Sequence, residues 1–229
     1  MKADPTILVT GFAPFGGERI NPSWEVAKAL PAKFGTHVVR TLRVPTAFGD
    51  AVKTVAAAYE KYQPSLIVLI GQAGGRAAIS VERVAININD ARIADNAGHQ
   101  PTDEIIAKDG PAAYFATLPI KSMVAAMRKR GIPAEVSNSA GTFVCNHLMY
   151  GVLHYLHYLH HLHNLHHLAR SNSATRAGFI HVPYLPSQVT DRPATASMTL
   201  EVMTAGIEAA IATALKTKRD RKLVGGTTH

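Results

Sequence analysis

The stretch Pro64-Ser65-Leu66-Ile67-Val68-Leu69-Ile70-Gly71 decides the fold class of this chain. Its residues 66–70 are apolar without interruption, so an extended strand here has two apolar faces. Strands of this kind are covered by helices on both sides and belong to parallel sheets. We therefore predict an α/β protein in which residues 66–70 form a central strand.

Segments on both sides of this strand alternate between strand patterns and helix patterns. Strands are predicted at 6–10, 38–44, 134–137 and 179–183, and helices at 48–62, 120–130 and 197–215. A further helix is predicted to begin at Asn21 as N-cap, with Pro22 in the first helical position. This alternation predicts a single-domain, three-layer α/β/α sandwich around a twisted, mostly parallel sheet, spanning residues 1–229.

Composition excludes several classes of protein. The chain has 229 residues, of which 47% are hydrophobic and 17% charged, which is typical of a globular protein and not of a disordered one. No apolar run approaches the ~20 residues that span a bilayer, so we expect no contact with membranes. Asp4 and Pro5 interrupt the N-terminal segment before the apolar core of a signal peptide could form, so we expect a cytoplasmic location.

The net charge of +8 is concentrated near the C-terminus. Half of it comes from residues 216–222, within a basic C-terminal tail at 216–229 that we interpret as a solvated segment. The remaining charge is dispersed, and no basic stripe is interleaved with aromatic residues, as would be typical of a nucleic-acid-binding protein. We therefore expect no nucleic-acid partner.

Residues 153–168 read LHYLHYLHHLHNLHHL and hold seven of the twelve histidines. Leucine recurs every third residue, and this period drifts around a helix instead of forming a stripe. We interpret the segment near 153–175 as a low-complexity, helical insertion that lengthens a helix beginning near Asn146. Pairs such as His157 and His161 have the i, i+4 spacing of metal ligands, but no carboxylate or cysteine joins them, so we predict no resident metal.

Cys145 is the single cysteine, and it follows a turn of small residues at a predicted helix start. The helix dipole and free backbone N–H groups there would lower the pKa of the thiol and could hold an oxyanion. A buried, inert thiol is the alternative, and location alone leaves both open.

A nucleophilic thiol needs a histidine, and the histidine needs an acid that orients it. His181 lies near the end of a short apolar strand, where open α/β sheets place their active sites, although a structural histidine stays possible. Glu82 lies in apolar company after the glycines at 71, 74 and 75, and a carboxylate there needs a partner. Asp90, Arg92 and Asp95 are expected to pair with one another. This region lacks the GxGxxG pattern of a dinucleotide site.

The chain resembles the pyroglutamyl peptidase I family (pyrrolidone-carboxylate peptidases) from about Ile7 to the last predicted helix. The resemblance rests on four segments: TGFAPFGG at 10–17 with NPSW at 21–24, the stretch at 71–87, the stretch at 137–146, and GFIHVP at 178–183. It implies a cysteine exopeptidase that removes N-terminal pyroglutamate from peptides through a thioester. It also implies that Cys145 is the nucleophile, His181 the base and then the acid, and Glu82 the group that orients His181.

The resemblance further implies an apolar slot for the lactam ring. Gln72 would bind polar groups of the lactam, Arg92 would stabilise charge nearby, and the walls would be formed by Phe12, Phe15, Thr46, Ile93, Phe143 and Val144. The alternative for Phe12 and Phe15 is packing in the core. The resemblance implies no cofactor and a homo-oligomer, either a dimer or a tetramer.

Two other functions stay open at this point. A different thiol amidase or deamidase could use a similar α/β scaffold, and it would be favoured if the lactam slot did not form. A binding protein with a structural cysteine, or a metal-handling protein that uses the histidine tract, would need no catalytic cysteine. The segment between the cysteine and histidine motifs is also longer than the resemblance leads us to expect.

Overall fold

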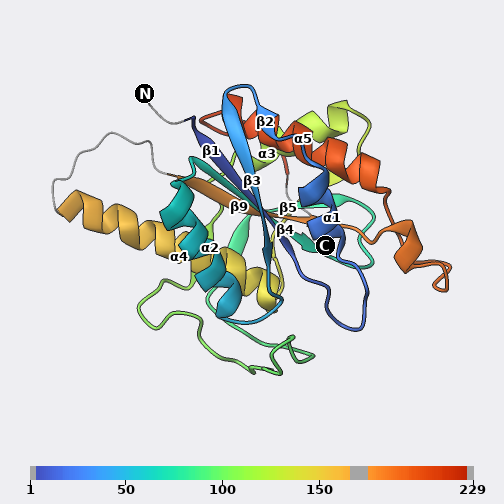
Figure 1. The fold of residues 1–229 in the computed structure, drawn as a ribbon, viewed down its shortest axis with the longest axis horizontal. Coiled ribbons are helices and arrows are strands. Elements are labelled where there is room, and N and C mark those ends of the chain that lie inside the picture. The colour runs from blue at the N-terminus through green and yellow to red at the C-terminus, as the bar shows by residue number, and fades with distance from the viewer. Residues whose placement is uncertain (1–3, 166–174, 226–229) are drawn as a thin grey trace.

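The computed structural model describes residues 4–165 and 175–225, and within this part seven strands form one sheet in the order β2-β3-β1-β4-β9-β5-β8 (Figure 1). The strands are β1 (Thr6–Phe12), β2 (Lys33–Phe34), β3 (His37–Val44), β4 (Leu66–Gln72), β5 (Ile79–Glu82), β8 (Ala134–Ser137) and β9 (Arg176–Val182). β3, β1, β4 and β9 are parallel to one another, whereas β5 runs antiparallel to β9 and parallel to β8. The predicted mostly parallel sheet is therefore confirmed.

Helices cover both faces of this sheet, which completes the predicted three layers (Figure 1). One face carries α1 (Pro22–Ala29), α3 (Ile120–Lys129) and α5 (Leu200–Lys216), and the other carries α2 (Asp50–Tyr62) and α4 (Val144–Leu165). The predicted central strand at 66–70 is fully buried between them. α1 begins as predicted, because the Asn21 side chain accepts a hydrogen bond from the Ser23 N–H at 3.1 Å and Pro22 follows it.

Four short strands were not predicted, and one of them, β2, pairs antiparallel with β3. β5 forms at the far side of β9, while β6 (Val84–Ile86) and β7 (Ala113–Phe115) pair into a separate two-stranded sheet. The helix predicted from Phe48 begins at Asp50 instead. Gly49 has a φ of +73°, which is outside helical geometry, so the chain enters α2 only after this residue.

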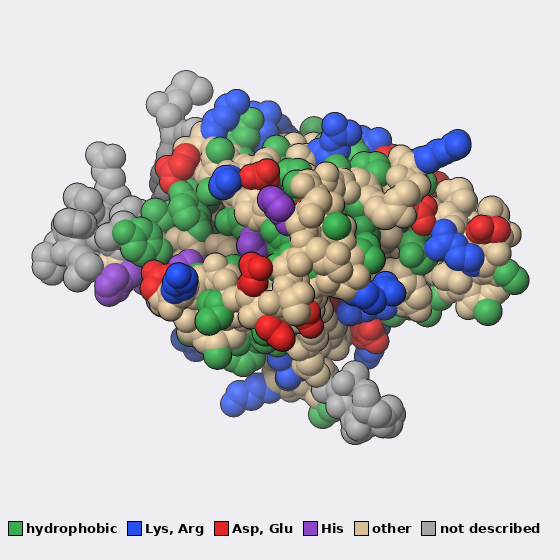
Figure 2. All heavy atoms as spheres, turned by 90° about the horizontal axis from the view of Figure 1, so that it is seen from below, with side chains coloured by type: hydrophobic (Ala, Val, Ile, Leu, Met, Phe, Trp, Pro, Cys, Tyr) green, Lys and Arg blue, Asp and Glu red, His purple; other side chains and the backbone are tan. Residues whose placement is uncertain are grey.

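The histidine-rich tract is helical as far as it is described. α4 begins at Val144, two residues earlier than expected, and continues to Leu165, whereas residues 166–174 of the predicted insertion lie outside the described residues. Figure 2 shows histidine side chains beside hydrophobic ones toward the end of the molecule that α4 reaches. Within residues 4–165 and 175–225, no group of three or more His, Cys, Asp or Glu side chains could hold a metal ion. No helix in the same ranges is long and apolar enough to cross a bilayer.

The basic tail is docked through its single acidic residue. Asp220 accepts hydrogen bonds from the N–H groups of Lys121 and Ser122, each at 2.9 Å, and thereby caps α3. Arg83 Nη2 holds the Gly225 carbonyl at 2.9 Å. The basic side chains at 218–222 are exposed, as expected for a solvated segment, but its backbone is fixed up to residue 225.

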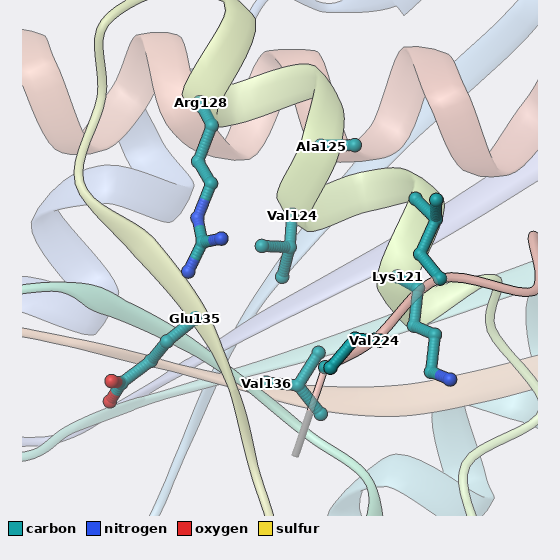
Figure 3. A pocket seen from close by; sticks show the side chains of 9 residues that line it. Lys121, Val124, Ala125, Arg128, Glu135, Val136 and Val224 are labelled. Carbon is teal, nitrogen blue, oxygen red and sulfur yellow. The ribbon is translucent and has the colours of Figure 1, made fainter. Parts of the chain in front are cut away.

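A cavity of about 440 Å³ lies between this docked tail, α3 and β8. Figure 3 shows Arg128 and Glu135 on one side of it and Lys121 on the other. The residues that line it are Lys121, Val124, Ala125, Arg128, Glu135, Val136, Leu223, Val224 and Gly225. None of the predicted site residues is among them, so this cavity is separate from the predicted chemistry.

Candidate active site

The structure brings together the three residues that were predicted to do chemistry. His181 comes from the end of β9, Glu82 from the end of β5, and Cys145 is the second residue of α4. His181 Nδ1 lies 2.8 Å from Glu82 Oε1, and both side chains are almost fully buried. Because the ionised carboxylate can only accept, His181 Nδ1 carries the proton and Nε2 is left for another partner.

Glycine 71 explains how the cysteine reaches the sheet. Gly71 is the β4 residue that pairs with His181 on β9, so the two Cα atoms are neighbours across the strands. A Cβ at Gly71 would lie 2.6 Å from Phe179 Cζ and 3.0 Å from Cys145 Sγ. The thiol therefore occupies space that a side chain at position 71 would need, directly beside the strand that carries His181.

Arginine 76 is a site residue that the sequence analysis did not single out. Its Nη1 lies 2.8 Å from Glu82 Oε1, the same oxygen that holds His181. Its Nη2 donates to the Ser139 carbonyl at 3.4 Å, in the loop that leads to Cys145. The signal available in the sequence was its position in the glycine-rich segment, six residues before Glu82.

The protonation states differ from those expected for a helix start. Burial and the Glu82 charge raise the pKa of Cys145 to about 12, and Arg76 opposes this rise. Burial and the Glu82 charge therefore act against the lowering of the thiol pKa that the helix start led us to expect. Burial also lowers the pKa of His181, although its hydrogen bond to Glu82 acts in the opposite direction. At neutral pH, the Cys145 thiol and the His181 imidazole are therefore both neutral, and a neutral imidazole can accept a proton.

Aromatic side chains form a small cluster on the first loop and the cysteine loop. The rings of Phe15 and Phe143 lie 6.2 Å apart, and Phe48 meets Phe143 edge-on at 5.4 Å. Phe15 and Phe143 are partly exposed, as a substrate slot requires. Phe12 is instead fully buried against Phe179, with ring centroids 6.3 Å apart, so packing accounts for it. Phe48 was missed by the sequence analysis, which placed it inside a helix.

Hydrogen bonds hold the loop at 46–49 that carries Phe48. The Phe48 N–H donates to Asp95 Oδ2 at 2.7 Å, and the Gly49 N–H donates to His147 Nε2 at 2.9 Å. His147 Nδ1 lies 3.0 Å from Asn89 Oδ1, so this network assigns the ring proton to Nδ1. Burial lowers the pKa of His147 to about 4. The ring is therefore neutral at neutral pH and acts as a fixed acceptor for the loop.

The Asp95 carboxylate binds this loop and does not pair with Asp90 or Arg92 as predicted. Besides Phe48, its carboxylate accepts hydrogen bonds from the N–H groups of Ala97 and His99. These bonds lower its pKa against the effect of burial. Within residues 4–165 and 175–225, no ion pair joins Asp90, Arg92 and Asp95, so the expected pairing among them is wrong. The reason is that backbone N–H groups of the turn at 95–99 satisfy this carboxylate.

The other predicted site residues occupy different environments. Thr46 Oγ1 donates to the Ala13 carbonyl at 2.8 Å, and Gln72 Oε1 accepts from Gln188 Nε2 at 3.1 Å. Val144 is fully buried at the start of α4. Arg92 and Ile93 are exposed, in a segment joined to the cysteine loop by the Asp90 N–H, which donates to the Thr142 carbonyl at 3.0 Å. Their predicted contacts with substrate stay predictions.

Comparisons with known proteins agree with this geometry. The family model described as pyroglutamyl peptidase matches residues 5–217. A pyrrolidone-carboxylate peptidase of Cupriavidus taiwanensis is 51% identical over 227 residues, covering 98% of this chain and 100% of that protein. One from Bacillus cytotoxicus is 50% identical over 225 residues, covering 98% and 99%.

Solved structures give the same result. The pyroglutamyl peptidase I of Bacillus amyloliquefaciens superimposes with a TM-score of 0.85 at 43% identity, covering 96% of this chain and 100% of that one. A mutant pyrrolidone carboxyl peptidase of Pyrococcus furiosus gives a TM-score of 0.81 at 41% identity, covering 92% and 98%.

Proposed function

This chain belongs to the pyroglutamyl peptidase family and is a cysteine exopeptidase that removes N-terminal pyroglutamate from peptides, and we propose that Cys145, His181 and Glu82 carry out its chemistry. One observation carries the assignment of residues. The only cysteine of the chain lies against Gly71, beside a buried histidine whose far nitrogen is held by a carboxylate at 2.8 Å. This is the arrangement of nucleophile, base and orienting acid that thiol catalysis requires.

The first half of the reaction forms a thioester. His181 Nε2 takes the proton from the Cys145 thiol, and the sulfur attacks the carbonyl carbon of the pyroglutamyl residue. The carbonyl oxygen becomes an oxyanion, which the Cys145 N–H can bind because the first N–H groups of α4 have no partner within the helix. The imidazolium then protonates the leaving nitrogen, the C–N bond breaks, and the shortened peptide departs.

The second half returns the enzyme to its resting state. Neutral His181 takes a proton from water, and the oxygen of that water attacks the thioester carbon. The C–S bond breaks, pyroglutamate leaves, and the sulfur recovers its proton from His181. In both halves Glu82 keeps the ring oriented and stabilises its positive charge.

The lactam ring is recognised by apolar walls and few polar groups. Phe15, Phe48 and Phe143 offer ring faces and edges to a flat, neutral lactam, which carries no free amine. Gln72 is the hydrogen-bonding group for the lactam edge, and the exposed Arg92 stabilises charge nearby. A peptide that begins with proline would bring a charged amine into the same apolar slot, at a cost in desolvation. This contrast favours the lactam over a general amidase substrate.

A pair of substrates and two variants test this assignment. Wild type should release the chromophore from a pyroglutamyl amide and not from the matching prolyl amide. Cys145→Ser should lose at least about 10³-fold in kcat, and Glu82→Gln should lose a large part of kcat with little change in KM. Circular dichroism and thermal unfolding show that each variant is folded. Full turnover by Cys145→Ser would overturn the assignment, and faster hydrolysis of the prolyl amide would favour the alternative amidase.

We also infer a cytoplasmic homo-oligomer, a dimer or a tetramer, without a nucleic-acid partner. Exposed hydrophobic side chains support an assembly surface: Ile105 is 64%, Phe115 68% and Tyr158 52% exposed. Analytical ultracentrifugation tests this, and a monomer at micromolar concentration would contradict it. The histidine-rich segment near 153–175 is proposed to be an insertion that contributes no catalytic group.

A further inference from the structure

Arg76 contacts both the acid of the proposed triad and the loop that carries its nucleophile, but it contacts neither reacting atom. Arg76 lies in the loop before β5, and its guanidinium contacts Glu82 at the end of β5 and Ser139, 63 residues away, in the loop before α4. Nη1 meets Glu82 Oε1 at 2.8 Å, and Nη2 meets the Ser139 carbonyl at 3.4 Å. A planar fork with several N–H donors can make both contacts at once, and an ammonium group cannot reproduce that geometry.

The Glu82 carboxylate has an unusual set of neighbours. It is completely buried, its Oε1 receives both His181 and Arg76, and its Oε2 has no hydrogen-bond partner within the described residues. Buried carboxylates are usually paired with a cation, and Arg76 is the cation that pairs with Glu82. Its side chain is 31% exposed, so the guanidinium is partly hydrated while its Nη1 reaches inward.

We propose that Arg76 is a positioning residue that holds the Glu82 carboxylate against His181 and joins the end of β5 to the loop before Cys145, thereby setting the pH range in which the thiol reacts. This inference rests on the proposed roles of Cys145, His181 and Glu82. It extends them by assigning the electrostatic balance of the site to one residue outside the triad.

The direction of the effect follows from the charges around the two reacting groups. Cys145 is influenced by Glu82, which raises the pKa of the thiol, and by Arg76, which lowers it. His181 is influenced by the same two residues with the same signs. The other elements packed here contribute Gly71 from β4 and Phe179 from β9, which carry no charge. Removal of Arg76 leaves the Glu82 charge unopposed, so the pKa values of both reacting groups rise.

A structural salt bridge would have different consequences. It would change thermal stability and could lower kcat by the same factor at every pH, but it would not shift the pH profile of kcat/KM. The single cysteine of the chain makes this distinction measurable without substrate, because iodoacetamide alkylation followed by mass spectrometry reports on Cys145 alone. At a fixed pH below the pKa of the thiol, the alkylation rate follows the thiolate fraction. This fraction falls tenfold for each rise of one unit in that pKa.

The experiment compares four proteins: wild type, Arg76→Met, Arg76→Lys and Arg128→Met. Arg128 is the matched control, because its guanidinium donates to a backbone carbonyl, that of Ala134, at the 440 Å³ cavity. For Arg76→Met we expect the acid limb of the kcat/KM profile to move up by about one pH unit and alkylation at pH 7 to slow about tenfold. Arg128→Met should leave both unchanged.

Arg76→Lys separates the charge from the fork and covers the case in which Arg76→Met does not fold. It keeps the positive charge, so alkylation should stay within about twofold of wild type, while kcat falls because the contact with Ser139 is lost. Wild-type alkylation and an unmoved acid limb in folded Arg76→Met would overturn the proposal. A tenfold loss of alkylation in Arg76→Lys would also overturn it. Neither result touches the triad, whose own failure would appear as retained turnover in Cys145→Ser.

Discussion

Acid should destabilise this protein through one buried histidine outside the triad. His147 accepts the Gly49 N–H at Nε2 and donates from Nδ1 to Asn89 Oδ1, and only 9% of the residue is exposed. A proton on Nε2 would place two donors face to face and break the bond that holds the loop at 46–49. The folded protein therefore resists protonation of this ring.

The size of the effect follows from the difference in pKa between the two states. The pKa of His147 is about 4 in the folded chain, against an ordinary value of 6.5 that applies when the chain is unfolded. Below pH 6.5 the unfolded chain binds this proton and the folded chain does not, so the free energy of unfolding falls with pH. The loss should reach about 3 kcal/mol by pH 4. Above pH 6.5 the full stability is present.

Urea unfolding at pH 7.5, 6, 5 and 4.5 measures this effect. His147→Gln keeps a donor and an acceptor but cannot titrate in this range, so its free energy of unfolding should fall less with acid than that of wild type. Asn89→Ala is the control: it removes the Nδ1 partner but keeps the ring, so it should lose stability at every pH and retain the pH dependence. If wild type and His147→Gln lost the same free energy between pH 7.5 and 4.5, the reasoning about this ring would be refuted.

Three further predictions concern the packing of Gly71 against the thiol, the proposed lactam slot and the C-terminal tail. Gly71→Ala should lower kcat about 10²-fold and cost about 1–3 kcal/mol of stability, because the new Cβ displaces the Cys145 sulfur. Kinetics and thermal unfolding of the folded variant check this. A wild-type kcat would contradict it. Phe48→Ala should raise KM for a pyroglutamyl amide several-fold, because the ring that packs on Phe143 would no longer contribute about 1 kcal/mol of aromatic contact with the lactam, and an unchanged KM would remove Phe48 from the slot. Asp220→Ala should cost about 1 kcal/mol of stability by uncapping α3 while leaving kcat/KM unchanged at 25 °C, and a wild-type melting temperature would contradict the capping role.

Local chemistry made part of the fold predictable. The cap at Asn21 and the uninterrupted apolar run at 66–70 express constraints within a few residues, and the structure places both as expected. β5 could not be found in this way. It is a four-residue strand whose neighbours are β9 and β8, so its existence depends on chain segments far away in the sequence. The start of α2 also depends on distant segments. Asp95 and His147 bind the N–H groups of Phe48 and Gly49, so these residues stay in the loop and α2 begins at Asp50.

In the candidate site, too, some features follow from local sequence and others depend on distant segments. Motifs singled out Cys145, His181 and Glu82, but no local pattern in the sequence indicates that a carboxylate at 82 meets a ring 99 residues away. The helix start is a local feature and favours a lowered thiol pKa, whereas burial and the Glu82 charge, which raise this pKa, depend on distant parts of the chain. Arg76 escaped notice for a related reason. The sequence around Arg76 gives no sign of its contact with Glu82, because that contact depends on where the sheet places β5.

The order of the strands explains why these residues act as a unit. β4 and β5 are consecutive in the chain, yet β9 lies between them in the sheet, so the loop at 73–78 crosses the end of β9 where His181 lies. The Ala73 N–H donates to the Val182 carbonyl at 2.9 Å, which fixes the loop on that strand. This crossing places Arg76 within 2.8 Å of Glu82. The strand order therefore brings the carboxylate, its counter-charge and the base together at this end of the sheet.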